Sequence, residues 1–432
     1  MTELLGIIQF IIIVCILIYE FKSKSSAVFL WAMLFIMFGM MHLIASFHGD
    51  NEYSDIVLCR ASFFVIGFCL IYFLTRYVIG SKTQNRMRGL INFNTLREQV
   101  SDEKFNELLF TVFFAGIIGL MMYPYIRYAG GILNTSWGDG RAFNATLQYA
   151  NTGQVYRILY FAFSGLVVIC ILNQKKYLTI ISCLLILFFV VLTRNRIDIL
   201  PLLCSLAFIM VAKNEKINFK VLLLGIVAAV LAVYIIYGLR VFRHYGSISA
   251  FIEKFEIKDF INRVNTYIET DNGELGLRRD FYHFVKYNNN FKNFGKGHTY
   301  IRMLLVYIPT EWSLGLKPPD FAQSMGSAVG MIVGGSTHPT LFGDCYANLG
   351  AFGIILGFFW AIYVSIADQI VLLQKRKTTA VFVYMIYAVT FIIIGRGSVY
   401  NSFWYLSYGL PVILFMDYII NKKKHYKIVF NG

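Results

Sequence analysis

Long runs of apolar residues, separated by short polar segments, dominate the pattern of this sequence. A helix needs roughly 20 mostly apolar residues to cross about 30 Å of hydrocarbon, and these runs have about that length. The pattern therefore predicts an all-α integral membrane protein with about eleven membrane-spanning helices. The predicted spans are 4–20, 26–47, 56–78, 107–126, 154–172, 177–193, 197–212, 221–238, 347–373, 379–395 and 400–420.

The polar segments between these runs alternate in their content of lysine and arginine. One set is rich in both, including Lys22 and Lys24, Arg76 with Lys82, Arg86, Arg88, Arg97 and Lys104, Lys175 and Lys176, Lys213, Lys216 and Lys220, Lys375, Arg376 and Lys377, and Lys422, Lys423, Lys424 and Lys427. The alternate short segments hold only Arg127, Arg141, Arg194, Arg196 and Arg396. Because basic residues favour the cytoplasmic side, the pattern predicts an external N-terminus and a cytoplasmic C-terminus.

A long segment before the ninth predicted span falls on the external side. The expected organisation is residues 1–238 with the first eight spans, 239–346 as one large external loop, and 347–432 with the last three spans and a basic cytoplasmic tail. Within the loop, apolar residues recur at helical spacing from Ile248 to Ile268, with Lys254, Lys258 and Arg263 among them. This spacing predicts short helices that lie on the membrane surface or cap the bundle.

Composition agrees with a membrane protein, since 57% of the residues are hydrophobic and 15% are charged. The net charge of +15 follows from the basic segments on one side, so it does not indicate binding to nucleic acid. The cysteines are scattered without a Cys-x-x-Cys pair, and the sequence has neither a G-x-x-x-x-G-K-[ST] loop nor an H-E-x-x-H motif. We therefore expect no cofactor, no metal site and no nucleotide-driven transport.

The cations of the short external segments are all arginine, whereas the cytoplasmic set is mostly lysine. Lysine suffices as a topology signal, but the planar guanidinium of arginine binds phosphate in a bidentate manner. The long loop adds further arginines, so the external side is expected to hold a phosphate group. The alternative is that these arginines extend to lipid headgroups or pair with Asp198, Asp280 and Asp344. Asp368 and Asp417, in the cytoplasmic half of their spans, are explained by extension toward a basic loop.

Three stretches resemble the Wzy-type O-antigen and capsule repeat-unit polymerases of bacteria. They are TRNRIDIL (Thr193 to Leu200), YIPTEWSLGLKPPDF (Tyr307 to Phe321) and GGSTHPTLFGDCYANLGAFG (Gly334 to Gly353). The architecture is similar over the whole chain, with many helices and a large external loop late in the sequence. The last stretch also resembles the related O-antigen ligases, in which a His precedes a Gly as His338 precedes Gly350. The ligases usually carry Asn where this chain has Pro339.

This resemblance implies a bundle like that of the membrane glycosyltransferases of the C class, in the bacterial cytoplasmic (inner) membrane. The implied activity joins oligosaccharide repeat units carried on undecaprenyl pyrophosphate, by transferring the growing glycan to an incoming lipid-linked unit. The partners are the lipid-linked donor and acceptor and the bilayer, and a chain-length regulator is a further candidate. The expected catalytic residues are His338 and Asp344; the pyrophosphate ligands are Arg194, Arg196, Arg240, Arg243, Arg278 and Arg279; and the glycan contacts are His298, Lys317, Tyr346 and Asn348.

These roles follow from the chemistry of glycosyl transfer. An acceptor hydroxyl must lose its proton as it attacks the anomeric carbon, and a His or a carboxylate usually accepts that proton. The departing pyrophosphate gathers negative charge, which positioned cations stabilise. His298 and Asp344 are the alternatives to His338 as the base.

Three other functions compete with this interpretation. Asp50, Glu52 and Asp55 in the first external loop are the acidic residues with which a metal-dependent transferase would hold Mg²⁺ or Mn²⁺. A flippase for lipid-linked oligosaccharides would instead need cations and polar residues along its spans. An O-antigen ligase would use the same donor with a different acceptor.

Overall fold

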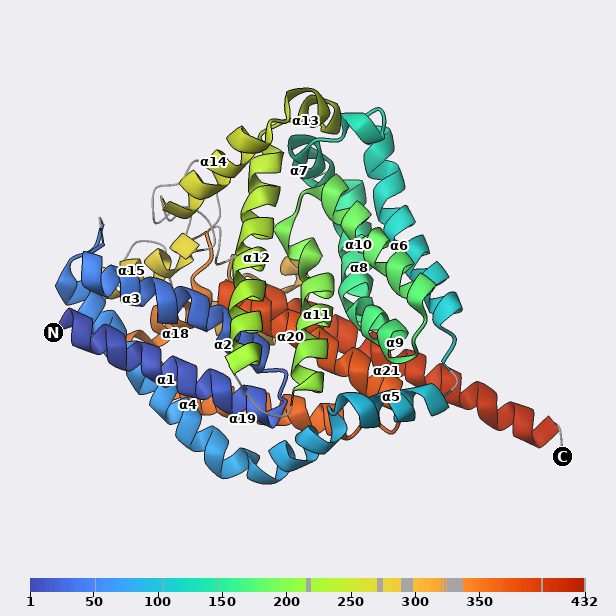
Figure 1. Ribbon diagram of the computed structural model, residues 1–432, viewed down its shortest axis with the longest axis horizontal. Helices are drawn as coiled ribbons and strands as arrows, with labels where there is room; N and C mark the ends of the chain where they lie inside the picture. The colour runs from blue at the N-terminus through green and yellow to red at the C-terminus, as the bar shows by residue number, and fades with distance from the viewer. Residues whose placement is uncertain are drawn as a thin grey trace. The chain divides into compact units, whose positions relative to one another are not determined.

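The structure is a computed structural model. It describes residues 1–50, 52–103, 105–145, 147–214, 219–269, 275–288, 298–319, 321, 324, 337–397 and 399–430. Every element of two or more residues in these ranges is a helix, which confirms the predicted all-helical class (Figure 1). An isolated antiparallel β-bridge pairs Ser136 with Ser247. Gly334 to Ser336 and Asp320, which belong to the stretches compared above, lie outside the described residues.

Within the described ranges, eight helical stretches are long and apolar enough to cross a membrane. They are Thr2–Ser23, Val28–His48, Asp55–Ser81, Glu107–Tyr128, Val155–Leu172, Lys176–Thr193, Thr340–Leu372 and Lys377–Arg396. Each coincides with a predicted span. The other three predicted spans fall on α11 (Leu200–Lys213), α12 (Phe219–Arg243) and α21 (Val399–Phe430), and their crossing stays a prediction. The chain is thus a helical, multi-pass membrane protein.

The chain packs into two compact units. Unit 1 comprises Met1–Arg88, Asp271–Ile370 and Thr390–Leu406, and unit 2 comprises Gly89–Thr270, Val371–Val389 and Ser407–Gly432. This division follows packing, whereas the expected division of the sequence at residues 238 and 346 follows membrane topology. Each unit is therefore built from segments that are far apart in the chain.

Unit 1 begins with an apolar helical hairpin, whose two arms run antiparallel. Its helices are α1 (Thr2–Ser23), α2 (Val28–Leu34), the π-helical η1 (Phe35–Met40), α3 (Met41–His48), α4 (Asp55–Leu90), α15 (Arg278–Lys286), α16 (His298–Leu304), α18 (Thr340–Leu349) and α19 (Leu356–Leu372). Figure 1 shows α1 beside α2 and α3, in agreement with their contacts. The wider π-turn changes the backbone hydrogen bonding, and the buried Gln9 amide of α1 donates to the carbonyl of Phe38 at 2.6 Å.

Unit 2 contains most of the remaining helices. They are α5 (Phe93–Asp102), α6 (Glu107–Tyr128), α7 (Trp137–Ala145), α8 (Leu147–Ala162), α9 (Leu166–Leu172), α10 (Lys176–Thr193), α11, α12, α13 (Ile248–Lys254), α14 (Ile257–Glu269) and the larger parts of α20 (Lys377–Arg396) and α21. The expected short helices of the long loop are α13 and α14. Ser247 caps α13 by accepting a hydrogen bond from the amide of Ala250 at 3.1 Å. Val264 of α14 is buried, and α14 packs on α12.

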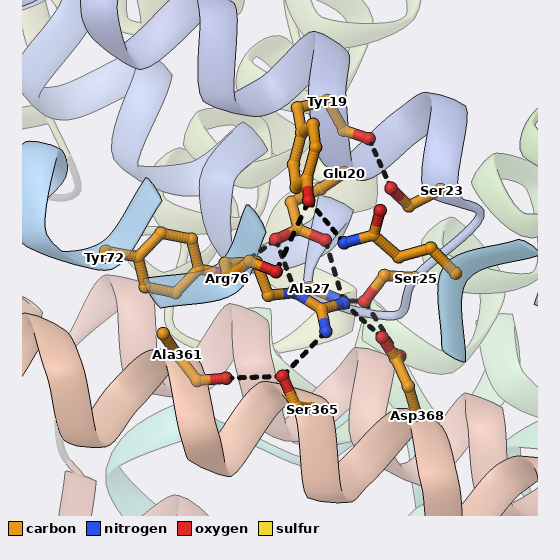
Figure 2. A network of polar contacts seen from close by, with 11 residues as sticks. Tyr19, Glu20, Ser23, Ser25, Ala27, Tyr72, Arg76, Ala361, Ser365 and Asp368 are labelled. Atoms are coloured by element: carbon orange, nitrogen blue, oxygen red, sulfur yellow. Dashed lines mark hydrogen bonds and ion pairs between the residues drawn. The ribbon is translucent and has the colours of Figure 1, made fainter. Parts of the chain in front are cut away.

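A buried ion network in unit 1 is centred on Arg76 of α4 (Figure 2). Its Nε donates to Oε1 of Glu20 at 3.0 Å, and its Nη2 donates to Oε2 of Glu20 at 3.2 Å. Nη2 also donates to Asp368, and Nη1 donates to the hydroxyl of Ser365 at 2.9 Å. The three charged side chains have an exposed fraction of 0%. Arg76 therefore connects α1, α4 and α19 at one level of the bundle.

Hydroxyl groups complete the hydrogen bonding of the two carboxylates. Tyr72 donates to Glu20 at 2.8 Å, and Ser25 donates to Asp368 at 2.8 Å (Figure 2). Ser25 lies in the turn between α1 and α2, so the network also fixes that turn. Buried charges are tolerated where ionic partners and hydrogen bonds replace water, and these contacts meet that condition.

The first helix and α4 run in the same direction. Thr2 Oγ1 lies 3.3 Å from Cys59 Sγ near the start of both helices, and Glu20 meets Arg76 near their other ends. The topology predicted from loop charge requires this, because the first and third spans must cross the membrane in the same sense. The packing is consistent with that topology.

The start of α19 runs in this direction as well. A Cβ on Gly357 would lie 2.5 Å from the carbonyl oxygen of Phe68, so only glycine permits this approach to α4. Further along both helices, at equal spacing, Ser365 accepts from Arg76. Because α4 and α19 run in the same direction, the number of membrane crossings between them along the chain must be odd. The candidate spans Glu107–Tyr128, Val155–Leu172 and Lys176–Thr193 lie between them, so α11 and α12 must either both cross the membrane or both not cross it. The predicted spans, which include both, meet this condition.

Three expectations are corrected by these contacts. Arg76 does not belong to a basic loop, because α4 continues as one helix to Leu90 and buries this side chain. Asp368 does not extend toward a basic loop, because it is buried and paired with Arg76. The helix after the long loop begins at Thr340, before the expected start near Ala347, so Asp344 is a helical residue.

We expect Arg76→Ala to destabilise the protein by about 3–5 kcal/mol, because it leaves two buried carboxylates without their cation. The measurement is thermal unfolding of the purified protein in detergent. Arg86→Ala is the matched control, since Arg86 is an exposed arginine on the same helix. Equal stability of the two variants would show that the network does not hold the three helices together.

Candidate functional site

A cluster of charged side chains lies in unit 1 where α3 ends, α4 begins and α15 begins. We call it the Arg278 cluster and define it as Asp50, Glu52, Arg278, Arg279, Asp280 and Thr337. Asp50 Oδ2 is 3.8 Å from Arg278 Nη2 and 3.6 Å from Arg279 Nε. Glu52 Oε1 is 3.6 Å from Arg279 Nη1. Two of the expected phosphate-binding arginines are therefore adjacent and are oriented by the loop between α3 and α4.

The two acidic partners differ in their exposure to solvent. The carboxylate side chain of Asp50 is 1% exposed, whereas that of Glu52 is 58% exposed. Asp50 is therefore a fixed support for both arginines, whereas Glu52 pairs with Arg279 at an exposed position. Exposed ion pairs of this kind contribute little to stability.

Asp280 joins this cluster to the segment that carries His338. The hydroxyl of Thr337 donates to Asp280 Oδ2. His338, the next residue, is partly buried, and a Cβ on Gly397 would lie 2.6 Å from the His338 Cβ. Unit 1 thus places His338 near the start of α18, next to the end of α20, and one residue from the contact with Asp280.

Burial raises the pKa of Asp280 from 3.8 to about 7, with a smaller upward contribution from Glu52, while the hydrogen bond from Thr337 opposes the shift. A carboxyl with this pKa exchanges its proton near neutral pH. Asp280 was expected only as a partner for arginine, and its partner is instead the hydroxyl of Thr337.

A chain of three hydrogen-bonding side chains lies beneath the Arg278 cluster and was not expected from the sequence. His42 Nε2 is 2.7 Å from Ser62 Oγ, and His42 Nδ1 is 2.5 Å from the hydroxyl of Tyr282. All three are buried, at 1% exposure or less. The order of hydroxyl, imidazole and orienting group is that of an activated nucleophile, but a nucleophile must reach its substrate. In the described state these contacts hold α3, α4 and α15 together. The signal in the sequence was a histidine inside an apolar span.

The second expected catalytic residue, Asp344, is 1% exposed in α18. The amide of Asn348 donates to the carbonyl oxygen of Asp344 at 2.7 Å and contacts Oδ1 at 3.3 Å. Asn348 also accepts a hydrogen bond from the amide of Thr299 at 3.2 Å. The Asp344 carboxylate thus lies inside the packing of α16 against α18, whereas His338 lies nearer the surface.

The expected glycan-binding residues make contacts within unit 1. His298 Nε2 is 3.0 Å from the carbonyl oxygen of Pro319, and Lys317 Nζ donates to the carbonyl of Ile308 at 2.7 Å. The hydroxyl of Tyr346 donates to Asn288 at 3.3 Å. Together with Asn348, these side chains are largely buried and shape the segment between α15 and α18. Their contact with glycan stays a prediction.

Arg194 has a structural environment in unit 2. It is 0% exposed, and its guanidinium donates to the carbonyls of Gly246 and Thr135, the second at 2.8 Å. Its Cζ is 4.5 Å from the ring centroid of Phe242. Burial lowers the pKa of Arg194, and the guanidinium compensates through these carbonyl contacts. The side chain joins the turn before α7 to the turn before α13.

The other unit 2 arginines differ among themselves. Arg243 Nε donates to the carbonyl of Arg194 at 2.8 Å, and its Cζ lies 4.8 Å from the centroid of Trp137. Arg240 has its Cζ 4.5 Å from the centroid of Tyr267. Arg196 is partly buried in the short helix that precedes α11. The six expected pyrophosphate ligands thus divide into Arg278 and Arg279 in unit 1 and the other four in unit 2.

Asp198, one of the acidic residues expected to pair with an arginine, forms an ion pair with Arg157 of α8. Arg157 Nη2 donates to Asp198 at 2.7 Å, and Asp198 also accepts from the hydroxyl of Thr193 at 2.9 Å. The hydroxyl of Tyr160 donates to the backbone carbonyl of Asp198. This ion pair holds the start of α11 against α8.

The loop between α3 and α4 holds the acidic residues with which a metal-dependent transferase would bind a cation. In this structure Asp50 and Glu52 contact arginines. The described residues contain no group of three or more His, Cys, Asp or Glu side chains arranged to hold a metal ion. A cation at this position would also have to lie beside two guanidinium groups. The geometry of the described loop therefore favours an anion over a divalent metal.

Comparison of the sequence with protein-family models gives no match, and comparisons with curated proteins and with solved structures give none either.

We expect Asp280→Asn to change how stability depends on pH. Because the folded-state pKa of Asp280 is raised from 3.8 to about 7, the folded protein binds this proton more tightly than the unfolded chain does. Its contribution to stability is greatest below pH 3.8 and falls as pH rises to about 7. As pH rises from about 5 to about 7, the free energy of unfolding of the variant should therefore fall less than that of the wild type.

The measurement is the unfolding temperature in detergent across this pH range. Asp102→Asn, at an exposed carboxyl at the end of α5, is the control. A wild-type pH slope that Asp280→Asn leaves unchanged would show that Asp280 does not titrate in this range.

Proposed function

We propose that this chain is a membrane glycan polymerase that joins oligosaccharide repeat units carried on a polyprenyl pyrophosphate. The observation that carries the proposal is the Arg278 cluster, in which two adjacent arginines are linked through Asp280 and Thr337 to His338. The cluster supplies cations for a pyrophosphate, and the adjoining His338 supplies a base for an acceptor hydroxyl. The resemblance of the Gly334 to Gly353 stretch to the Wzy-type polymerases supports the same function.

In this proposal Arg278 and Arg279 hold the pyrophosphate of the donor, and Arg279 makes the outer contact because its side chain is 22% exposed whereas that of Arg278 is 4% exposed. Asp50 keeps the two guanidinium groups in position, and the exposed Glu52 carboxylate leaves when the phosphate arrives. As the glycosidic bond to the pyrophosphate breaks, the negative charge on the leaving oxygen increases. Arginines that are already oriented stabilise this charge without reorganisation. Among the unit 2 arginines, Arg194 has a weaker claim, since it already donates to two carbonyls.

His338 is the proposed base. Imidazole is the side chain that most often acts as a general base in enzymes. The hydroxyl of the incoming unit loses its proton to His338 as its oxygen bonds to the anomeric carbon, and the bond to the pyrophosphate breaks. Asp344 and His298 have a weaker claim, because Asp344 is buried and His298 contacts the carbonyl of Pro319.

The membrane brings the two substrates of the proposed reaction together. Both substrates carry polyprenyl chains, so the bilayer confines them beside the protein and the lipid product stays there. Holding both reacting ends in one site turns a bimolecular step into an effectively unimolecular one. The proposed location is the cytoplasmic membrane of a bacterium, with the Arg278 cluster on its outer face.

A transporter is the second candidate, and the Arg76 network favours it because charged residues inside spans are often part of a transport path. Along α4, however, Phe64 and Phe68 lie between Ser62 and Arg76. Both are buried, and the ring centroid of each lies 5.2–5.5 Å from a neighbouring aromatic ring. The two polar regions of unit 1 are thus separated by packed aromatic side chains, which favours the enzyme.

The decisive experiment is an assay of purified protein in liposomes with a pyrophosphate-linked oligosaccharide. A polymerase produces a ladder of glycan lengths on lipid. A ligase or a metal-dependent transferase moves a single oligosaccharide onto a different acceptor, and the metal-dependent enzyme loses activity with a chelator. A flippase produces no new glycosidic bond and changes only the side on which the substrate is accessible. Only the ladder supports the proposal.

We expect His338→Ala to reduce polymerisation by about 10²–10⁴-fold, which is the range for loss of a general base. The protein should still fold and bind the lipid-linked donor. His48→Ala is the matched control, since His48 is exposed and its Nδ1 contacts a carbonyl of its own helix. Polymerisation at a near-normal rate in His338→Ala would remove His338 from the mechanism.

The proposed orientation has its own test. A reporter fused after Lys377 or at Gly432 should be cytoplasmic, and one inserted between residues 134 and 151 should be external, because basic residues favour the cytoplasmic side. Compartment-specific reporter enzymes measure this directly. Exchanged compartments would place the Arg278 cluster on the cytoplasmic face, where it would not meet an externally presented substrate.

A further inference from the structure

The segment that follows α16 exposes a dense set of large apolar side chains. We call residues 304–316 the Trp312 loop. Its exposed apolar residues are Leu304, Tyr307, Ile308, Trp312, Leu314 and Leu316. Trp312 is 77% exposed, Leu314 is 91% exposed and Leu316 is 69% exposed. Contiguous exposed apolar surface of this kind marks contact with a membrane or with another protein.

The base of this loop is attached to membrane-spanning helices of unit 1. The amide of Thr299 donates to Asn348 of α18, and the hydroxyl of Tyr300 lies 3.6 Å from Cys345 Sγ on the same helix. Arg302 Cζ is 4.4 Å from the ring centroid of Tyr400, in the first turn of α21. These contacts fix the loop beside α18, which begins the candidate span Thr340–Leu372.

The neighbouring surface of that span is apolar as well. Leu349, directly after Asn348, is exposed, and so are Phe352 and Ile355 in the next turns. In a helix that crosses a membrane, exposed side chains of this type face lipid. The Trp312 loop thus adjoins a surface that needs a bilayer, and this favours lipid over a second protein as its partner.

The backbone of the loop sets the depth to which it can enter. Its backbone hydrogen bonds are mostly those of short turns, among them Ile308 N to Leu305 O, Trp312 N to Pro309 O and Leu316 N to Ser313 O. Irregular backbone exposed to lipid is excluded from the hydrocarbon core, because its remaining polar groups would lack partners there. Tryptophan and tyrosine concentrate at the headgroup level. The geometry therefore suits the interface and not the centre of the bilayer.

We propose that the Trp312 loop is a membrane-interface anchor, which inserts Trp312, Leu314 and Leu316 among the headgroups and upper acyl chains beside α18. Lys317 Nζ donates to the carbonyl of Ile308 and closes the base of the loop. The anchor depends only on the chain being a membrane protein and is independent of the proposed polymerase activity.

The test uses the fluorescence of Trp312 in liposomes, obtained as the difference between wild type and Trp312→Phe. Quenching is measured with lipids brominated near the headgroup end of the acyl chain, with lipids brominated near its methyl end, and with aqueous iodide. The anchor predicts strong quenching by the shallow bromines, weaker quenching by the deep bromines and little quenching by iodide.

Two substitutions in the loop test whether insertion depends on its apolar side chains. Leu314→Asp should abolish the quenching by shallow bromolipid and make Trp312 accessible to iodide, since a charge disfavours insertion. Thr310→Asp is the matched control, because it adds the same charge to an exposed polar residue of the same loop. Quenching by iodide alone in the wild type would place the loop in water. Quenching by neither agent would show that protein covers it. Either outcome overturns the proposal.

Discussion

The buried guanidinium of Arg76 constrains the rest of unit 1, because a charge without access to water must keep its partners. Glu20 comes from α1, Asp368 from α19 and the hydroxyl donor Ser25 from the turn before α2. Replacing such a network by apolar side chains of the same shape often costs little, whereas removing one member costs several kcal/mol. Its main effect is therefore on register. It fixes how far α1, α4 and α19 can slide past one another.

That register positions the other end of the same helices. Because α4 is held in place at Arg76, its first turns position Ser62 within hydrogen-bonding distance of His42. His42 in turn contacts the hydroxyl of Tyr282 of α15. Arg278 and Arg279 precede Tyr282 on that helix, so their reach toward Asp50 depends on the hydrogen bonds beneath them. The Arg278 cluster thus rests on a buried support, as a binding site requires if its side chains are to be oriented before the ligand arrives.

The arginines of this chain have different tasks, although they look alike in the sequence. Arg194 donates to the backbone carbonyls of two turns, and Arg157 neutralises a buried aspartate. Arg279 has an outer partner, Glu52, that is exposed and exchangeable. In the proposed function, the phosphate takes the place of this exposed contact. The roles of Arg278 and Arg279 as phosphate ligands stay predictions.

The sequence by itself determined the helical membrane class, eight helices that are long and apolar enough to cross a membrane, and the short helices of the long loop, because hydropathy and helical spacing are local properties of the chain. It could not determine which charges are buried together. The sequence places Arg76 with a basic loop and explains Asp368 by extension toward such a loop, because its partner Glu20 lies 56 residues from Arg76 along the chain and Asp368 lies 292 residues from it. His42 was overlooked because its partners lie on α4 and α15. Only the tertiary structure decided these pairings, because the energy of a charge depends on what packs against it.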